Sequence, residues 1–193
     1  MVAADPDLLI CAETDSAAGA IQFVKDSDVD LAIVDLSLKD GDGLQLIRSL
    51  RDVSPEIQVL VLSMHDEALF AERALKAGAR GYIMKQEAVV GLVGAIRHVL
   101  SGRIYLSDPM SQHLLERIGP SAQTTDSGPS LLTDRELQVF EMIGRGVSTS
   151  LIAEQIGVSV KTVETYRGNI KTKLNLKDGF ELVKYAASWV ERL

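Results

Sequence analysis

The chain has 193 residues, enough for one large domain or two small ones. Hydrophobic residues make up 46% and charged residues 24%, which is typical of a soluble globular protein, and no apolar run reaches the roughly 18 residues that span a bilayer. No basic region precedes the first apolar stretch, so we expect a cytoplasmic protein without a secretory signal or membrane partner.

The charge is spread unevenly over the chain. Residues 1–131 have a net charge of −8, whereas residues 132–193 have a net charge of +1. Within the second part, residues 160–177 hold five basic side chains and one acidic side chain. An acidic half joined to a half with a basic stripe predicts two functions, and the basic stripe is where a polyanion could bind.

Strand and helix patterns alternate in the first half. Four short aliphatic runs predict strands: LLICAE (8–13), LAIVDL (31–36), IQVLVLS (57–63) and GYIM (81–84). Apolar residues at helical spacing predict helices in SAAGAIQFVKDS, GLQLIRSLRDV, EALFAERALKAG and VVGLVGAIRHVLSG (89–102). Runs that are apolar throughout favour strands buried on both faces. We therefore predict a doubly wound α/β domain with a parallel sheet over residues 1–107, with Cys11 as a reduced core thiol.

A boundary follows this domain. Residues 108–131 comprise a further helix, DPMSQHLLERIG, and the segment GPSAQTTDSGPS (119–130), whose composition predicts a flexible linker. Residues 132–193 have no strand pattern. They read as a small all-α domain of four helices: TDRELQVFEMIGRG, STSLIAEQIG, SVKTVETYRGNIKTKL and DGFELVKYAASWV. Thr133 and Ser148 suit helix N-caps, and Gly146 and Gly157 suit helix ends.

The middle of the all-α domain predicts a helix-turn-helix. A short helix and a tight turn at Gly157 precede a longer helix, which places an apolar row on one face and a polar row with Lys161 and Thr165 on the other. Such an exposed face can enter the major groove of double-stranded DNA, and basic side chains further along suit phosphates. The plain alternative is a solvated Lys-rich face without a ligand.

Five segments strengthen the DNA-binding interpretation. LTDRE, G-x-S, IAEQIGVSVKTVETY, NIKTKL and ELVKYA together resemble the LuxR-type DNA-binding domain along residues 131–190. The candidate DNA-binding residues are Lys161, Thr162, Thr165, Tyr166, Arg167, Lys171 and Lys173. The chain departs from the pattern at residues 149–151, where the family often has Asn-Lys-Glu, and at Tyr166, where many members have His. The last helix often dimerises in this family, so Trp189 is a candidate for a homodimer interface or for core packing.

Four residues of the first half match a receiver domain. Asp35 ends an apolar strand, Ser63 follows 28 residues later at the next strand end, and Lys85 follows 22 residues after that in GYIMK. The carboxyl ends of parallel strands lie in one crevice, so we expect these side chains to converge. The pattern resembles the receiver of a NarL/FixJ-type two-component response regulator. The resemblance implies that Asp35 is the phosphoacceptor, Ser63 and Lys85 contact the phosphoryl group, Tyr82 is the aromatic switch and a sensor histidine kinase is the donor.

The resemblance also implies a Mg²⁺ ion, which Asp35 and a pair of acids after the first receiver strand hold. That strand, its acids and the first helix do not precede LLICAE here. Three explanations stay open: a late start codon or trimmed sequence, a degenerate receiver that holds Mg²⁺ poorly, or a slide of LLICAE into the vacant slot beside LAIVDL. The slide would bring Glu13 and Asp15 to Asp35 as substitute metal ligands. Without the first helix, an apolar patch of the sheet should seek a partner.

Three functions are compatible with these patterns. The first is a DNA-binding transcription regulator controlled through its receiver by phosphoryl transfer. The second is an enzyme, since doubly wound domains also serve as phosphatases or flavin carriers. We disfavour it because no metal cluster or activated Ser–His pair is seen, and His65 is predicted to face solvent. The third is a degenerate DNA-binding regulator or interaction protein that works without phosphorylation.

Overall fold

The computed structural model describes the chain except for residues 1, 3–4, 39–41, 119–127 and 192–193. The chain divides into two compact units, Met1–Ala122 and Gln123–Leu193. Most of the predicted linker lies outside the described residues. Residues 128–130 of it lie in a short 3₁₀ helix, η2 (Gly128–Leu131).

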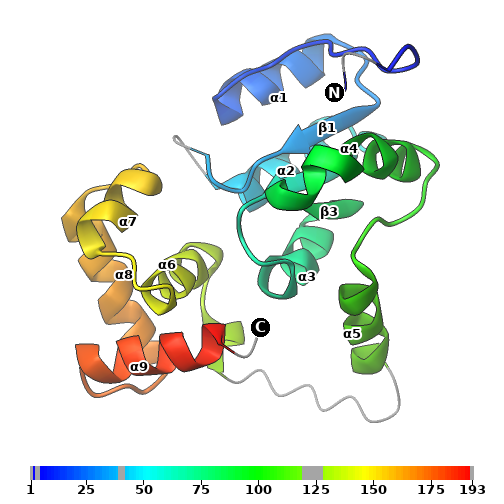
Figure 1. Cartoon of the computed structure of the whole chain (residues 1–193). Coiled ribbons are helices and arrows are strands. Elements are labelled where there is room, and N and C mark those ends of the chain that lie inside the picture. Colours follow the sequence, from blue (N-terminus) through cyan, green and yellow to red (C-terminus); the bar gives the residue numbers. More distant parts are fainter. Residues whose placement is uncertain (1, 3–4, 39–41, 119–127, 192–193) are drawn as a thin grey trace. The chain divides into compact units, whose positions relative to one another are not determined.

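Unit 1 is built on a parallel sheet of three strands in the order β1-β2-β3. Its outer strands, β1 and β3, are labelled in Figure 1. The strands are β1 (Leu31–Val34), β2 (Gln58–Ser63) and β3 (Gly81–Met84). Five helices accompany them in the described part of this unit: α1 (Ala17–Asp26), α2 (Gly43–Val53), α3 (Glu67–Ala77), α4 (Lys85–Leu100) and α5 (Asp108–Ile118). The predicted α/β class is confirmed.

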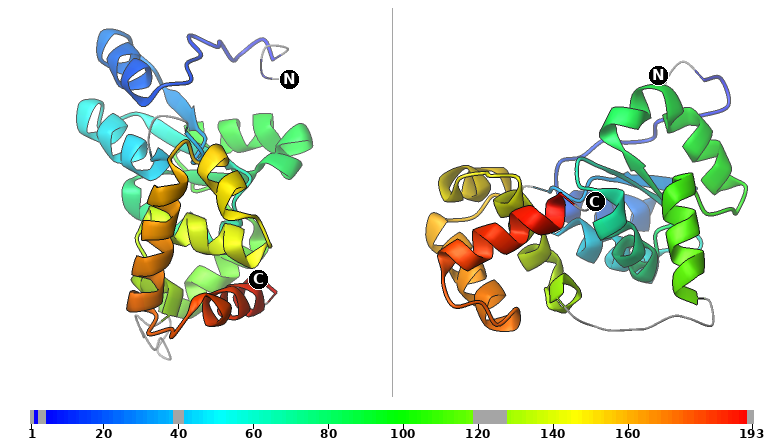
Figure 2. Two further views of the ribbon diagram at one scale, coloured as in Figure 1. Left: turned by 90° about the vertical axis from the view of Figure 1, so that its left-hand side faces the viewer. Right: turned by 60° about the horizontal axis from the view of Figure 1, so that its bottom comes forward.

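Helices cover both faces of this sheet. Leu60 and Ile83 pack with four residues of α4 in one buried cluster. Because side chains alternate along a strand, the buried Val59 and Val61 point to the opposite face, the side of α2 and α3. The left view of Figure 2 shows α1 and α2 (blue and cyan) on one side of the strands and α4 (green) on the other. The sheet therefore lies between two layers of helices, as in a doubly wound domain.

The prediction of a strand at residues 8–13 is wrong, because this segment has no strand or helix. Leu9 and Ile10 remain 85% and 45% exposed, and Cys11 is exposed rather than a core thiol. A strand forms only where a neighbouring strand exchanges backbone hydrogen bonds with it, and residues 8–13 pair with none of the three strands of this sheet. The apolar run alone therefore does not make a strand.

Helix α4 begins earlier than predicted, at Lys85 directly after β3. Its N-cap, Met84, has no side-chain capping bond, so no local capping signal marks this start. Helix α5 matches its prediction and packs against α3, with Met110 buried. The Ser107 backbone N–H donates to Glu67 of α3 at 3.0 Å, which ties this end of unit 1 together.

Unit 2 is all-helical in its described part, as predicted. It contains α6 (Asp134–Gly144), α7 (Thr149–Gln155), α8 (Val160–Lys173) and α9 (Gly179–Val190). Helix α6 contacts the other three, and its apolar side chains, among them Val139 and Phe140, are fully buried. Trp189 packs against Phe140 with ring centroids 5.4 Å apart. Trp189 therefore takes part in the core of unit 2 and remains partly exposed.

The local signals at the helix ends of unit 2 are confirmed. Thr133 and Glu136 form a capping box at the start of α6, and Ser148 accepts the Leu151 N–H at the start of α7. Gly146 and Gly157 adopt φ of 76° and 68°, a left-handed conformation that ends helices and suits glycine.

Candidate functional site

Asp35 and Lys85 meet at the carboxyl end of the sheet of unit 1. Asp35 follows β1, and Lys85 follows β3. The Lys85 Nζ lies 2.6 Å from Asp35 Oδ2, while Asp35 Oδ1 accepts the Ser37 backbone N–H at 3.0 Å. The Lys85 side chain is 37% exposed and the Asp35 side chain is 31% exposed. The carboxylate is therefore oriented by the protein and remains open to solvent.

Ser63 lies at the same end of the sheet. It is the last residue of β2, where it pairs in register with Met84, the residue before Lys85. Val34, the residue before Asp35, pairs with Val61. Ser63 is fully buried, and its hydroxyl accepts the His65 backbone N–H at 3.0 Å. The strand ends thus bring these residues to one edge of the sheet, as the topology requires.

Tyr82 and His65 lie beneath this edge. Tyr82 is 1% exposed, and its hydroxyl donates to the His65 carbonyl at 2.8 Å. His65 is only 8% exposed, so the prediction that it faces solvent is wrong. Its ring packs on Phe70, and its Nε2 lies 3.0 Å from the Ser37 Oγ. Sequence reasoning missed this residue because the turn that folds it inward is not visible as a motif.

Helix α2 begins in close contact with the segment that carries Asp35. A Cβ added to Gly43 would lie 2.5 Å from the Leu36 Cα and 2.7 Å from the Asp35 carbonyl oxygen. Asp42 caps the helix by accepting the Leu44 N–H. Only glycine allows this approach, so the sequence DG at 42–43 helps to place the Asp35 segment.

Helix α8 is the second helix of the predicted helix-turn-helix, and its two faces divide as predicted. Val163 and Ile170 are fully buried, whereas Lys161 and Thr165 are exposed. Of the other candidate DNA contacts, Thr162, Tyr166, Arg167 and Lys171 are half-buried, and Lys173 is exposed. Ser159 caps the helix by accepting the Thr162 N–H, so the first turn presents its side chains from a fixed backbone.

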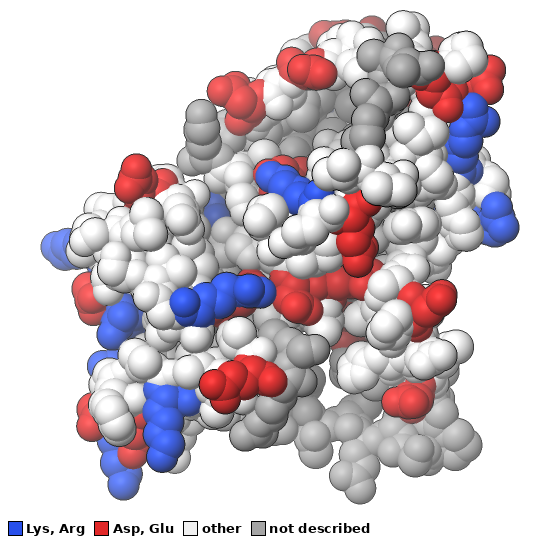
Figure 3. Space-filling view, viewed as in Figure 1, with Lys and Arg blue, Asp and Glu red and all other residues white. Residues whose placement is uncertain are grey.

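Two of the predicted phosphate contacts have partners inside unit 2. Arg167 donates to the Thr149 hydroxyl of α7 at 3.3 Å, and Lys173 lies 2.5 Å from the Glu136 carboxylate of α6. On the face of unit 2 shown in Figure 3, Lys and Arg side chains are spread over the surface with Asp and Glu side chains between them.

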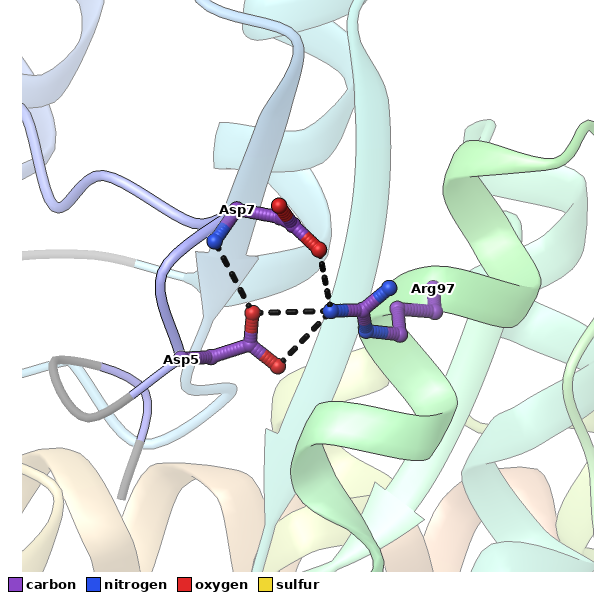
Figure 4. A network of polar contacts seen from close by, with 3 residues as sticks. All are labelled: Asp5, Asp7 and Arg97. Atoms are coloured by element: carbon purple, nitrogen blue, oxygen red, sulfur yellow. Dashed lines mark hydrogen bonds and ion pairs between the residues drawn. The ribbon is translucent and has the colours of Figure 1, made fainter.

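The N-terminal segment is tied to α4. Arg97 Nη2 lies 2.8 Å from Asp5 and 2.9 Å from Asp7, as Figure 4 shows. The hydrogen bond from Arg97 lowers the pKa of Asp5. Val2 and Leu8 pack against the buried cluster of α4. This segment therefore covers part of the apolar face that we predicted to be open.

The third explanation, a slide of LLICAE (8–13) into the slot beside β1, is wrong, because these residues form no strand. Glu13 and Asp15 are exposed in the segment before α1. Among the described residues, no group of three or more His, Cys, Asp or Glu side chains could hold a metal ion. The part of Asp35's surroundings that the structure describes therefore lacks the pair of acids that would complete the expected Mg²⁺ site. Also within these residues, no helix is long and apolar enough to cross a membrane.

Comparisons with known proteins cover both units. Residues 2–97 match the response regulator receiver domain, and residues 130–186 match the luxR family of bacterial regulatory proteins. The oxygen regulatory protein NreC of Staphylococcus epidermidis is 35% identical over 186 residues, which cover 93% of this chain and 85% of that protein. The transcriptional activator protein ExaE of Pseudomonas putida is 36% identical over 174 residues, 90% and 81% of the two chains.

Solved structures share the fold. A two-component response regulator of the LuxR family from Aurantimonas sp. SI85-9A1 is 30% identical with a TM-score of 0.54, over 59% of this chain and 82% of that one. RcsB from Salmonella enterica serovar Typhimurium, bound to promoter rprA, has a TM-score of 0.59 at 21% identity, over 96% and 89% of the two chains. The second likeness concerns the fold alone.

Proposed function

Because this chain belongs to the response regulators whose receiver domain is followed by a luxR-type DNA-binding domain, we propose that phosphoryl transfer to Asp35 controls it. The chain is a DNA-binding transcriptional regulator. In the proposed reaction a sensor histidine kinase in the cytoplasm supplies the phosphoryl group. The bond from phosphorus to the donor's histidine nitrogen breaks, that nitrogen keeps the electron pair, and a bond from phosphorus to an Asp35 oxygen forms.

The observation that carries this proposal is the contact of Lys85 with the carboxylate of Asp35 at 2.6 Å. A carboxylate that attacks a phosphoryl group needs a neighbouring positive charge, because both partners are anionic. Lys85 offers that charge, and the solvent exposure of both side chains leaves room for a donor. Ser63 supplies a hydroxyl at the same sheet edge, and Tyr82 lies behind it.

Labelling with a small phosphodonor such as acetyl phosphate tests this proposal. We expect mass spectrometry of the intact chain to detect one added phosphoryl group, and none in Asp35→Asn. Asp52→Asn is a matched control, because Asp52 is an exposed carboxylate of α2 away from the sheet edge. Equal labelling of the wild type and Asp35→Asn would rule out Asp35 as the acceptor.

A second candidate function has its own observation. Receiver domains typically use Mg²⁺, yet among the described residues no cluster of three or more His, Cys, Asp or Glu side chains is present to hold it. In this alternative, the ion pair with Lys85 is a permanent structural contact and the chain regulates transcription without phosphorylation. The labelling experiment separates the candidates, since only the first predicts modification of the wild-type chain.

We also propose how unit 2 engages DNA. Lys161, Thr162 and Thr165 lie in the first turns of α8, where side chains of a recognition helix reach base edges. Tyr166 and Lys171 are further along and suit phosphates. The chain acts as a homodimer in this proposal, with the exposed Phe180 and Val183 of α9 as the contact, which sedimentation at different ionic strengths would test.

A further inference from the structure

The ammonium group of Lys173 is bound within unit 2. Lys173 is the last residue of α8, and its Nζ lies 2.5 Å from the Oε2 of Glu136 in the first turn of α6. The Lys173 side chain is 36% exposed, whereas the Glu136 side chain is only 4% exposed. The pair joins two helices through residues that are 37 positions apart in the sequence.

The Glu136 carboxylate is held firmly in place. Its Oε2 also accepts the Thr133 backbone N–H at 2.8 Å, and the Thr133 hydroxyl accepts the Glu136 N–H in return. Burial raises the pKa of Glu136, but hydrogen bonds from Lys173 and Thr133 outweigh burial, and the pKa is lowered. A buried carboxylate left without its cation is costly, so Lys173 cannot leave for a phosphate without a large penalty.

A second contact holds the middle of the same helix. Arg167 donates to the Thr149 hydroxyl at the first residue of α7, and its Nε lies 3.6 Å from Glu164. Helix α8 is therefore fixed to α7 at its middle and to α6 at its end. Arg167 and Lys173, which make these two contacts, are both basic side chains that the sequence alone suggests as phosphate contacts.

We propose that Lys173 is a positioning residue, whose ion pair with Glu136 orients the recognition helix and which does not contact a phosphate. The inference rests on the proposed use of α8 as the DNA-contacting helix. Glu136 then supports DNA affinity although it is acidic and a negative charge near DNA would by itself weaken binding. Removing the charge of Glu136 should therefore weaken binding if the proposal holds, whereas electrostatics alone would strengthen it.

The salt dependence of DNA binding separates the two roles. The slope of log K against log salt falls by about 0.9 for each phosphate contact that is lost. With the full chain and a duplex enriched from a random library, we expect Lys171→Gln to reduce this slope. Lys173→Gln should weaken binding at every salt concentration and leave the slope unchanged. Lys76→Gln, an exposed lysine of unit 1, is the control that should change neither.

Two further variants complete the test. Glu136→Gln should weaken binding as Lys173→Gln does, and Lys173→Arg should restore most of the affinity. All measurements are made below the unfolding temperature of unit 2. The fluorescence of Trp189, the one tryptophan of the chain, reports that temperature. Unchanged affinity of folded Lys173→Gln, or a slope reduced as much as in Lys171→Gln, would overturn the proposal.

The outcome also distinguishes this inference from the proposed function. If Lys161→Ala and Lys171→Gln leave both affinity and slope unchanged, α8 is not the DNA-contacting helix and the proposed interface fails. If those two variants behave as expected and Glu136→Gln binds as well as the wild type, only the positioning role of Lys173 fails.

Discussion

At the scale of single residues, the partly exposed carboxylate of Asp35 in unit 1 lies next to a loop that the buried residues His65 and Tyr82 support. Asp35 is held through one oxygen by Lys85 and through the other by the Ser37 backbone. His65 lies behind this loop and joins Ser37 to the carbonyl contact of Tyr82. Asp35 is thus the solvent-accessible end of a chain of contacts that reaches the buried ring of Tyr82.

Replacing Lys85 by Met should affect chemistry more than stability. The ion pair with Asp35 is about one-third exposed, so its loss should cost below about 1 kcal/mol of unfolding free energy. The rate of labelling by acetyl phosphate should fall by roughly 100-fold, the typical effect of losing one electrostatic stabiliser of a reacting group. Chemical denaturation and time-resolved intact mass measure the two effects. A labelling rate equal to that of the wild type would contradict the role of Lys85.

Replacing His65 by Ala should destabilise unit 1 by about 1–2 kcal/mol, because the Ser37 hydroxyl loses its partner and Phe70 loses a packed ring. Urea denaturation followed by circular dichroism measures this. The matched control is His113→Ala, since His113 is exposed on α5 and its removal should leave the stability unchanged. Equal stabilities of the two variants would show that His65 supports nothing.

At the scale of helices and strands, close packing places both candidate sites. Gly43 lets α2 approach the Asp35 segment, and Gly144 lets α6 approach α9. A Cβ at Gly144 would lie 2.5 Å from the Ala186 carbonyl oxygen and 2.6 Å from Val190 Cγ2. The close contact of α6 with α9 therefore depends on a glycine at the last residue of α6.

Two glycine substitutions with opposite expected effects test this packing. Gly144→Ala should destabilise unit 2 by about 1–3 kcal/mol, because a backbone carbonyl must move. Gly168→Ala should stabilise it by up to about 1 kcal/mol, since α8 has open space there and alanine favours a helix. Thermal unfolding monitored by Trp189 fluorescence compares the two. The same sign of effect for both variants would argue against the packing.

The Glu136 carboxylate predicts how the stability of unit 2 depends on pH. Its pKa in the folded chain is below the ordinary value of 4.5, so the folded state favours the charged form. The stability that the charged Glu136 contributes to unit 2 is therefore fully present above pH 4.5, the ordinary pKa. This stability is lost as the pH falls through the lowered pKa of the folded chain. In Glu136→Gln the loss of stability in that acidic range should be smaller than in the wild type. Parallel pH profiles of unfolding would contradict this.

At the scale of the whole molecule, sequence patterns predicted two units and most of their elements correctly. GYIM became a strand with the predicted bounds, and Thr133 formed its capping box, because apolar runs and caps depend on nearby residues. The failures concern contacts between distant residues. LLICAE needed a neighbouring strand, and His65 needed Ser37, which lies 28 positions away. The partner of Lys173 in α6 was hidden for the same reason.

The same limit applies to the candidate sites. The meeting of Asp35 and Lys85 followed from the topology of a parallel sheet, so it was predictable without side-chain detail. The inward position of Tyr82 relative to His65 depends on a turn whose shape no motif records. The sequence assigned Arg167, Lys171 and Lys173 alike to phosphates, and only the structure shows that Arg167 and Lys173 have partners in α7 and α6.

A titration with beryllofluoride, a phosphoryl mimic, read by the DNA affinity of the full chain tests the central claim most directly. The probe is a duplex enriched from a random library, with magnesium present at constant ionic strength. If the occupied state of Asp35 controls unit 2, affinity should rise by roughly 5- to 100-fold, the usual range of coupling between two sites. Asp35→Asn should bind DNA but not respond. An identical DNA affinity of the wild type with and without beryllofluoride would contradict control through Asp35.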